Sequence, residues 1–221
     1  MPHVVEPLKN ATFNDALKRL RAVQNYLVSR AKETIYSSDF ESSNWGTSVK
    51  RAFVKLNVGE VPELIGKSEE KLGEIINIAA TVERLIDAIY WFAMHLKGGG
   101  CLIQECHPST SDEKDANDLV IVDPKGKIVI RCEVCDVASY NANSNNKEKK
   151  DISNLECEKT VPEDGVGRFI CTAPEFADSL ASSKRKWDSK PYRYELIRTG
   201  SIADTCMLLI KPALQHYNRK Q

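Results

Sequence analysis

The stretch NDLVIVDPKGKIVIRCEVCD, residues 117–136, has the pattern of two β-strands joined by a tight turn. Asp-Pro-Lys-Gly at 123–126 puts Asp, Pro and Gly at the positions that a type I turn prefers. The flanking runs, 118–123 and 127–137, are rich in Val and Ile, which are enriched in strands. The stretch therefore predicts an antiparallel β-hairpin.

The hairpin brings two acidic residues together. A loop centred between Lys125 and Gly126 sets Asp118 opposite Glu133, with Cβ atoms ~5 Å apart on one face. A three-residue loop with a bulge would instead shift the register by one residue. Two neighbouring carboxylates repel unless a proton or a cation lies between them. Oxygen ligands favour Mg²⁺, Mn²⁺ or Ca²⁺ over zinc, and such an ion can activate water for attack on phosphorus.

A structural alternative needs no ligand. In that interpretation Asp118 caps the strand and Glu133 is a solvated side chain on the outer face of the sheet.

Helices and short strands alternate over the rest of the chain, which predicts a mixed sheet flanked by helices. Thr12 is a plausible N-cap for the first helix, and residues 37–67 form a loop-rich link. Apolar periodicity predicts helices over 12–36, 68–97, 147–158 and 174–187, and strands over 101–106, 118–123, 127–137, 167–173, 192–199 and 203–211.

Composition limits the classes of function. The 221 residues carry 31 basic and 31 acidic side chains, so no overall field attracts nucleic acid or an anionic membrane. The longest apolar stretch, residues 85–96, is too short and polar to span a bilayer, and the N-terminus lacks the pattern of a secretory signal. Seven cysteines suggest no disulfide framework. We therefore expect a soluble cytoplasmic protein without a membrane partner.

The order helix, three-stranded meander, helix, strand, with Asp118 before the second strand and Glu133 on the third, resembles the PD-(D/E)xK nucleases. This superfamily has the restriction-endonuclease-like fold. Its motif is Pro-Asp, a gap, then Asp/Glu-x-Lys. The matching positions are Asn117-Asp118 and Glu133-Val134-Cys135, and the resemblance covers roughly residues 68–173.

The chain departs from the motif at two positions. Asn117 replaces the proline, which is a minor change. Cys135 replaces the lysine, which in this family orients the attacking water and offsets negative charge. Some family members take that group from the next helix, where this chain has Lys147, Lys149 and Lys150. Lys147 and Lys150 share a helix face. A solvated helix turn is the structural alternative.

The resemblance implies an α/β fold with a restriction-endonuclease-like core: a helix, an antiparallel three-stranded meander, a crossover helix and a parallel fourth strand. Residues 1–66 would be an N-terminal helical extension packed on a nuclease domain of residues 67–221, which also carries the C-terminal strands.

The implied activity is Mg²⁺-dependent or Mn²⁺-dependent hydrolysis of double-stranded DNA, as in type II restriction endonucleases, by a homodimer. Asp118 and Glu133 would hold the metal, with Lys147 or Lys150 near the scissile phosphate. Glu105, Glu83 or Asp87 could add a ligand. The alternative within the fold is an inactive protein that binds nucleic acid or a protein partner, and Cys135 is its best argument.

A third possibility is a zinc-stabilised interaction module, because Cys132 and Cys135 have zinc-knuckle spacing. Strand residues three positions apart point to opposite faces, however, which separates the two thiols. Candidate contacts to nucleic acid lie in the basic segments 50–55 and 182–187 and in the Asn-rich segment 140–146.

Overall fold

A computed structural model describes residues 7–37, 56–58, 68–70, 72–96, 99–108, 117–135, 149–155, 165–182, 192–199 and 205–212. The helices are α1 (Phe13–Ser37), α3 (Leu72–His95), a short helix over residues 149–154 and α5 (Pro174–Ser182). The strands are β1 (Leu8–Ala11), β2 (Leu56–Val58), β3 (Ser68–Glu70), β4 (Leu102–Cys106), β5 (Leu119–Val122), β6 (Ile128–Cys135), β7 (Gly167–Thr172), β8 (Tyr192–Arg198) and β9 (Cys206–Pro212).

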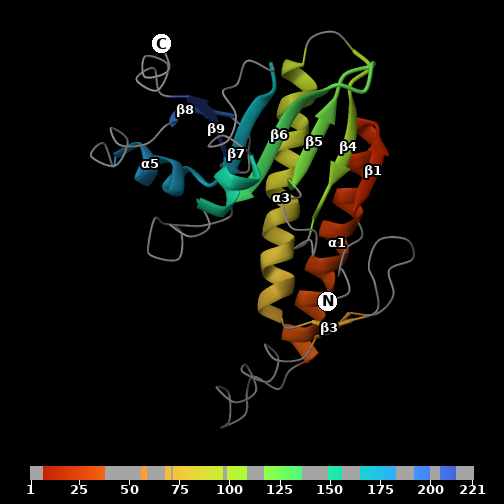
Figure 1. Ribbon diagram of the computed structural model, residues 1–221. Helices are drawn as coiled ribbons and strands as arrows, with labels where there is room; N and C mark the ends of the chain where they lie inside the picture. Colours follow the sequence, from red (N-terminus) through yellow and green to blue (C-terminus); the bar gives the residue numbers. More distant parts are fainter. Residues whose placement is uncertain are drawn as a thin grey trace, which may run out of the picture.

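Seven strands form one mixed sheet in the order β1-β4-β5-β6-β7-β9-β8 (Figure 1). β4, β5 and β6 are an antiparallel meander, and β7 joins β6 in parallel. The connection from β6 to β7 contains the short helix. The expected mixed α/β architecture is confirmed, and the candidate site belongs to the middle of this sheet.

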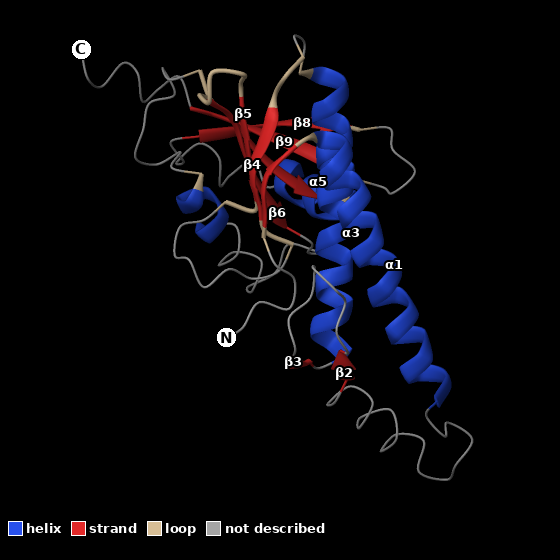
Figure 2. Ribbon diagram, turned by 90° about the vertical axis from the view of Figure 1, so that its right-hand side faces the viewer, coloured by secondary structure: helices blue, strands red, loops and turns tan. Residues whose placement is uncertain are grey.

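The two long helices cover one face of the sheet, which we call the inner face. α1 packs along α3, and Figure 2 shows both on the same side of the strands. The predicted cap of α1 is confirmed, because Thr12 Oγ1 accepts a hydrogen bond from the Asp15 backbone amide at 3.1 Å. The main core lies here and includes Leu20, Leu85 and Phe92.

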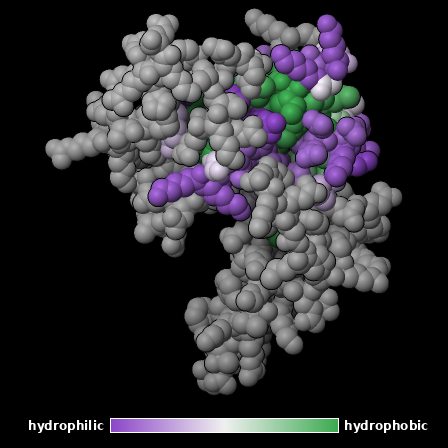
Figure 3. All heavy atoms as spheres, viewed as in Figure 1, coloured by the Kyte–Doolittle hydropathy of each residue, from purple (hydrophilic) through white to green (hydrophobic). Residues whose placement is uncertain are grey.

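The opposite face, called the outer face, faces the viewer in Figure 1. A second, smaller core lies there. It joins the short helix and α5 to β6, β7, β8 and β9 through residues such as Ile152, Ile170 and Phe176. The described side chains visible from this side are mostly hydrophilic, around a hydrophobic patch over β4–β6 (Figure 3).

Three segments differ from expectation, and one of them is β2, a strand within the expected loop-rich link. Residues 68–70, predicted as the first turn of the long helix, form β3 and pair with β2 inside the expected link. β1 is an additional strand that pairs with β4. Pairing with a distant segment prevailed over the local Ser-Glu-Glu helix-start signal at 68–70. No helix among the described residues is long and apolar enough to cross a membrane.

Candidate functional site

The turn between β5 and β6 has a three-residue loop rather than the even loop assumed from sequence. The Asp123 backbone amide donates to the Lys127 carbonyl at 2.8 Å, which closes the loop. Asp123 Oδ1 accepts hydrogen bonds from the amides of Lys125 and Lys127 at 2.8 and 2.9 Å. Gly126 has a φ of 79°, a backbone conformation that glycine adopts without steric cost. The loop is thus the common three-residue hairpin loop, a type I turn followed by one residue in the left-handed conformation.

A bulge restores the expected register. Val129 is an extra residue on β6, because the partners jump from Val122↔Ile128 to Ile121↔Ile130. Beyond it the pairs are those of an even loop, Val120↔Arg131 and Leu119↔Cys132. The loop assumption was wrong, but the bulge compensates for it. Continuing the ladder by one residue brings Asp118 alongside Glu133.

Asp118 holds the ends of three strands together. Its carboxylate Oδ2 accepts a hydrogen bond from the Val134 backbone amide at 2.7 Å on β6. Its carbonyl accepts one from the His107 amide at 2.8 Å, just after β4. The half-buried carboxylate therefore has the strand-capping role of the structural alternative, and its donor, Val134, directly follows Glu133 in the chain.

Glu133 is buried, not solvated, with only 2% of its surface exposed. Its Oε1 accepts a hydrogen bond from Asn117 Nδ2 at 2.8 Å, and the same nitrogen donates to the Asn154 carbonyl at 3.0 Å. A buried carboxylate requires such donors because burial removes its hydration. Asn117, which seemed a minor departure from the motif, links this glutamate to the end of the short helix.

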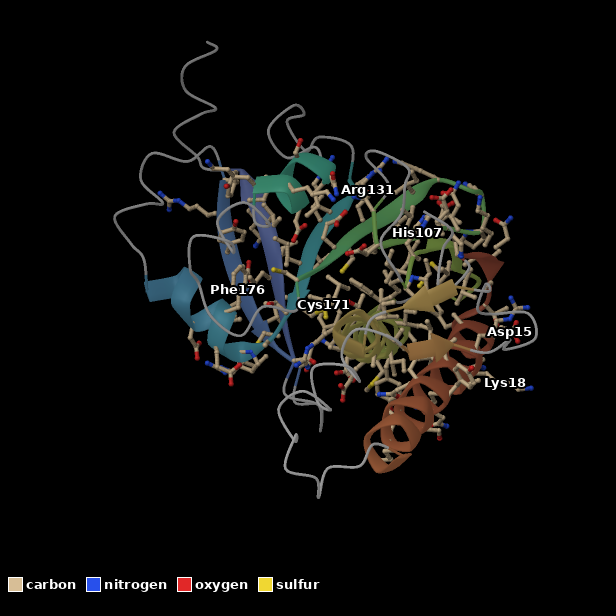
Figure 4. The ribbon with its side chains drawn as sticks, turned by 90° about the horizontal axis from the view of Figure 1, so that it is seen from below. Asp15, Lys18, His107, Arg131, Cys171 and Phe176 are labelled. Atoms are coloured by element: carbon tan, nitrogen blue, oxygen red, sulfur yellow. The ribbon has the colours of Figure 1, made fainter. Side chains whose placement is uncertain are left out.

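Two arginines that were not singled out from sequence lie beside the acids on the outer face. Arg131 Nη1 donates to Asn117 Oδ1 at 2.8 Å. Figure 4 shows Arg131 on the side of the sheet away from α1 and α3. Its partner on β7 is Arg168, which is 2% exposed and donates through Nε to the Leu155 carbonyl at 2.8 Å. The sequence signal that could have identified them is a single arginine within each otherwise apolar strand.

The position of the family's lysine is buried. Cys135 has no exposed surface and belongs to the outer-face core with Ile152 and Ile170. Lys149 and Lys150 open the short helix and are exposed. Lys147 lies outside the described residues. The site therefore has no lysine where the motif would place one, and the structure does not bring Lys150 into a hydrogen bond or ion pair with either acid.

The thiols of the Cys-x-x-Cys point into different cores, as expected. Cys132 belongs to the inner-face core and Cys135 to the outer-face one. Burial raises the pKa of the Cys132 thiol, and the nearby Cys171, Asp118 and Glu133 raise it further. Burial likewise raises the Cys106 pKa, with a smaller effect from Asp118. Because Cys132 and Cys135 lie in different cores, the two thiols are not placed to bind one zinc ion together.

The remaining candidate ligands are divided between two places. Glu105 lies near the site, with Oε2 3.4 Å from Nε2 of the buried His107. Asp87 lies elsewhere, on α3, where Oδ2 accepts a hydrogen bond from Thr205 Oγ1 at 2.7 Å. Burial raises the Asp87 pKa, and the Thr205 hydrogen bond and the Arg84 charge lower it less. Glu83 is exposed on the same helix. Of the three predicted extra ligands, only Glu105 lies on the strands of the site.

Within the described residues, no group of three or more His, Cys, Asp and Glu side chains is arranged to hold a metal ion. Mg²⁺ does not require such a group, because proteins commonly hold it through one or two carboxylates, waters and substrate phosphates. Asp118 and Glu133 lie at the same end of β5 and β6 and accept hydrogen bonds from the Val134 amide and from Asn117. Carboxylate oxygens are donors of the kind that Mg²⁺ or Mn²⁺ prefers and that zinc does not favour.

The predicted nucleic-acid contacts in segments 50–55 and 140–146, and all but Ser182 of segment 182–187, lie outside the described residues. Comparisons of the chain with models of protein families, with curated proteins and with solved structures gave no significant match.

Proposed function

We propose that the chain is a divalent-metal-dependent endonuclease of the restriction-endonuclease-like type, which hydrolyses phosphodiester bonds of double-stranded DNA. The observation that carries the proposal is the hydrogen bond from the Val134 amide to Asp118 Oδ2 at 2.7 Å. With the Leu119↔Cys132 pair, it supports a position of Asp118 next to Glu133, where the antiparallel meander meets parallel β7. The order α3, β4, β5, β6, short helix, β7 supports the same fold assignment.

Asp118 and Glu133 would hold Mg²⁺ or Mn²⁺, which when bound polarises a phosphoryl oxygen and lowers the pKa of water. Asn117 would hold Glu133 in place by donating a hydrogen bond to its Oε1 at 2.8 Å. Lys147 or Lys150 would approach the scissile phosphate from the start of the short helix. Two copies of the chain, each cutting one strand, would make a double-strand break.

A second candidate is a protein of the same fold that binds nucleic acid or a protein partner without cleavage. Cys135 favours it, because this position is fully buried among apolar side chains and cannot supply a cation. Asp118 also already accepts a hydrogen bond from the Val134 amide. A backbone donor of that kind gives the carboxylate a structural role that needs no metal.

Incubation with supercoiled DNA in Mg²⁺ or Mn²⁺ separates the two candidates. We expect nicked or linear product from the wild type, and none from Asp118→Ala or Glu133→Ala or when the metal is chelated. Glu175→Ala, which removes an exposed acid on α5, serves as the matched control and should cleave normally. DNA binding without cleavage would support the second candidate, and cleavage that survives both site substitutions would refute the first.

A further inference from the structure

Arg131 lies two residues before Glu133 on β6, whereas the family's lysine would lie two residues after it. Side chains two residues apart on a strand share a face, so Arg131 and Cys135 flank Glu133 on the outer face of β6. Cys135 is buried among apolar residues, whereas Arg131 is only half-buried. The positive charge beside Glu133 therefore lies two residues before it, not two residues after it.

Among the described residues, Arg131 uses only a small part of its hydrogen-bonding capacity. A guanidinium carries five N–H donors. Arg131 uses Nη1 to donate to Asn117 Oδ1 at 2.8 Å, and the described residues provide it with no other hydrogen bond and no ion pair. A partly desolvated guanidinium with free donors favours an anion, and its planar fork matches the oxygens of a phosphate.

Asn117 keeps this cation and the acid apart. Its amide oxygen accepts from Arg131, while its amide nitrogen donates to Glu133 Oε1 at 2.8 Å. The neutral amide thus fixes both groups without letting them form an ion pair. Arg131 therefore keeps its positive charge for an anion.

The neighbouring strand adds to the positive potential. Arg168 is the partner of Arg131 in the β6–β7 pair, so the two cations lie on adjacent strands of one face. Arg168 is directed to backbone carbonyls, donating to Leu155 at 2.8 Å and to Val166 at 3.2 Å. It is buried, which leaves Arg131 as the arginine of this pair that a ligand can reach.

We propose that Arg131 is the phosphate-binding cation of this site and contacts a non-bridging oxygen of the DNA backbone next to the Asp118–Glu133 pair. The assignment rests on the proposed function and adds the residue that compensates for Cys135. It also gives Asn117 a positioning role, because its amide holds the guanidinium and the glutamate at a fixed separation.

The test measures binding of a short DNA duplex by fluorescence anisotropy over a salt series, with Ca²⁺ present to favour binding over cleavage. Arg131→Gln removes the charge and keeps an amide donor for Asn117. We expect its affinity to fall about tenfold and the slope of log affinity against log salt to decrease by about one. Arg131→Lys should retain the slope, since the charge remains, but lose cleavage rate because the fork is gone. Arg21→Ala, an exposed arginine on α1, should change nothing.

The outcomes separate this assignment from the function on which it rests. An Arg131→Gln variant with the melting temperature of the wild type and an unchanged salt slope would overturn the assignment, while metal-dependent cleavage lost in Asp118→Ala would leave the function standing. A wild-type chain that neither binds nor cleaves DNA would overturn both. If Arg131→Gln unfolds, the salt slopes of Arg131→Ala and Arg131→Lys are compared: a lower slope for Arg131→Ala supports the assignment, and equal slopes overturn it.

Discussion

At the residue scale, the environment of position 135 decides whether a motif lysine could act there. Cys135 has no exposed surface, and its carbonyl accepts a hydrogen bond from Thr172 Oγ1 at 2.6 Å on β7. A side chain at this position lies in the outer-face core, which also includes Ile152 and Ile170, and not in an open site. A lysine introduced at position 135 is therefore expected to affect the stability of the fold before it can affect activity.

Cys135→Lys is expected to destabilise the fold by several kcal/mol, because an ammonium placed among apolar side chains loses its hydration. Cys135→Ala removes the thiol without adding a charge. We expect it to lower the free energy of unfolding by about 1 to 2 kcal/mol less than Cys135→Lys does. Urea denaturation of both variants measures the difference. If Cys135→Lys proved as stable as Cys135→Ala and cleaved DNA faster than the wild type, the side chain at 135 would have to reach the site.

Asp87 gives a pH-dependent prediction at the same scale. Burial raises its pKa, so the folded state binds a proton that the unfolded state has already released. The stability contributed by this carboxyl is complete at pH below its ordinary value and is lost as the pH rises through the folded pKa. Asp87→Asn cannot ionise and keeps an oxygen for the Thr205 hydroxyl.

The wild type should therefore lose stability relative to Asp87→Asn as the pH rises from about 4 toward neutrality. Urea unfolding at a series of pH values checks the sign, with Glu175→Gln on the surface of α5 as the control. If the difference in free energy of unfolding between the wild type and Asp87→Asn stayed constant with pH, or grew in favour of the wild type, burial would not be raising the pKa of Asp87.

At the element scale, the parallel junction of β6 and β7 depends on close backbone packing. A Cβ atom at Gly167 would lie 2.8 Å from Phe169 Cε2 and 3.0 Å from Ile130 Cδ1. Both neighbours belong to the inner-face core and have little room to move. This glycine lets β7 begin directly against β6 and so helps to place Arg168 beside Arg131.

Gly167→Ala is expected to lower the free energy of unfolding by about 1 to 3 kcal/mol through overpacking. Chemical denaturation followed by circular dichroism measures it. A variant as stable as the wild type would mean that the start of β7 can shift away from β6 at no cost.

The hairpin shows what periodicity can and cannot predict about an element. The strands, the turn and the pairing of Leu119 with Cys132 followed from alternation and turn chemistry. The loop length did not, because Asp123 closes a three-residue loop and the compensating bulge at Val129 has no signature in a run of Val and Ile. The two local errors cancel, and the register at Asp118 is the one expected.

At the scale of the whole molecule, the sequence predicted the mixed sheet and its two long helices because their apolar patterns extend over many residues. β1 was missed because a four-residue edge strand with only its two end residues buried gives almost no pattern. β3 was missed because its three residues, Ser-Glu-Glu, carry no strand pattern and form a strand only through their pairing with β2. Local propensity does not predict how short segments pair with other parts of the chain.

Some residues of the candidate site were predicted from the sequence, and others became visible only in the folded structure. Asp118 and Glu133 were predicted because acids at matched positions of a hairpin are visible in the chain. Asn117, Arg131 and Arg168 act through contacts across strands and with the end of the short helix, such as Asn117 to the Asn154 carbonyl. Only the folded arrangement brings them together. The sequence pattern does not show which polar side chains of separate strands will meet on one face of the sheet.

The central claim is that Asp118 and Glu133 hold one metal ion that cleaves DNA. The most direct test is the Mg²⁺-dependent rate of plasmid nicking by the wild type, by Asp118→Ala, by Glu133→Ala and by the double variant. If both carboxylates serve one ion, each single substitution abolishes most of the activity and the double variant is no worse than the singles. Substantial nicking by either single variant, or losses that multiply in the double variant, would contradict the account.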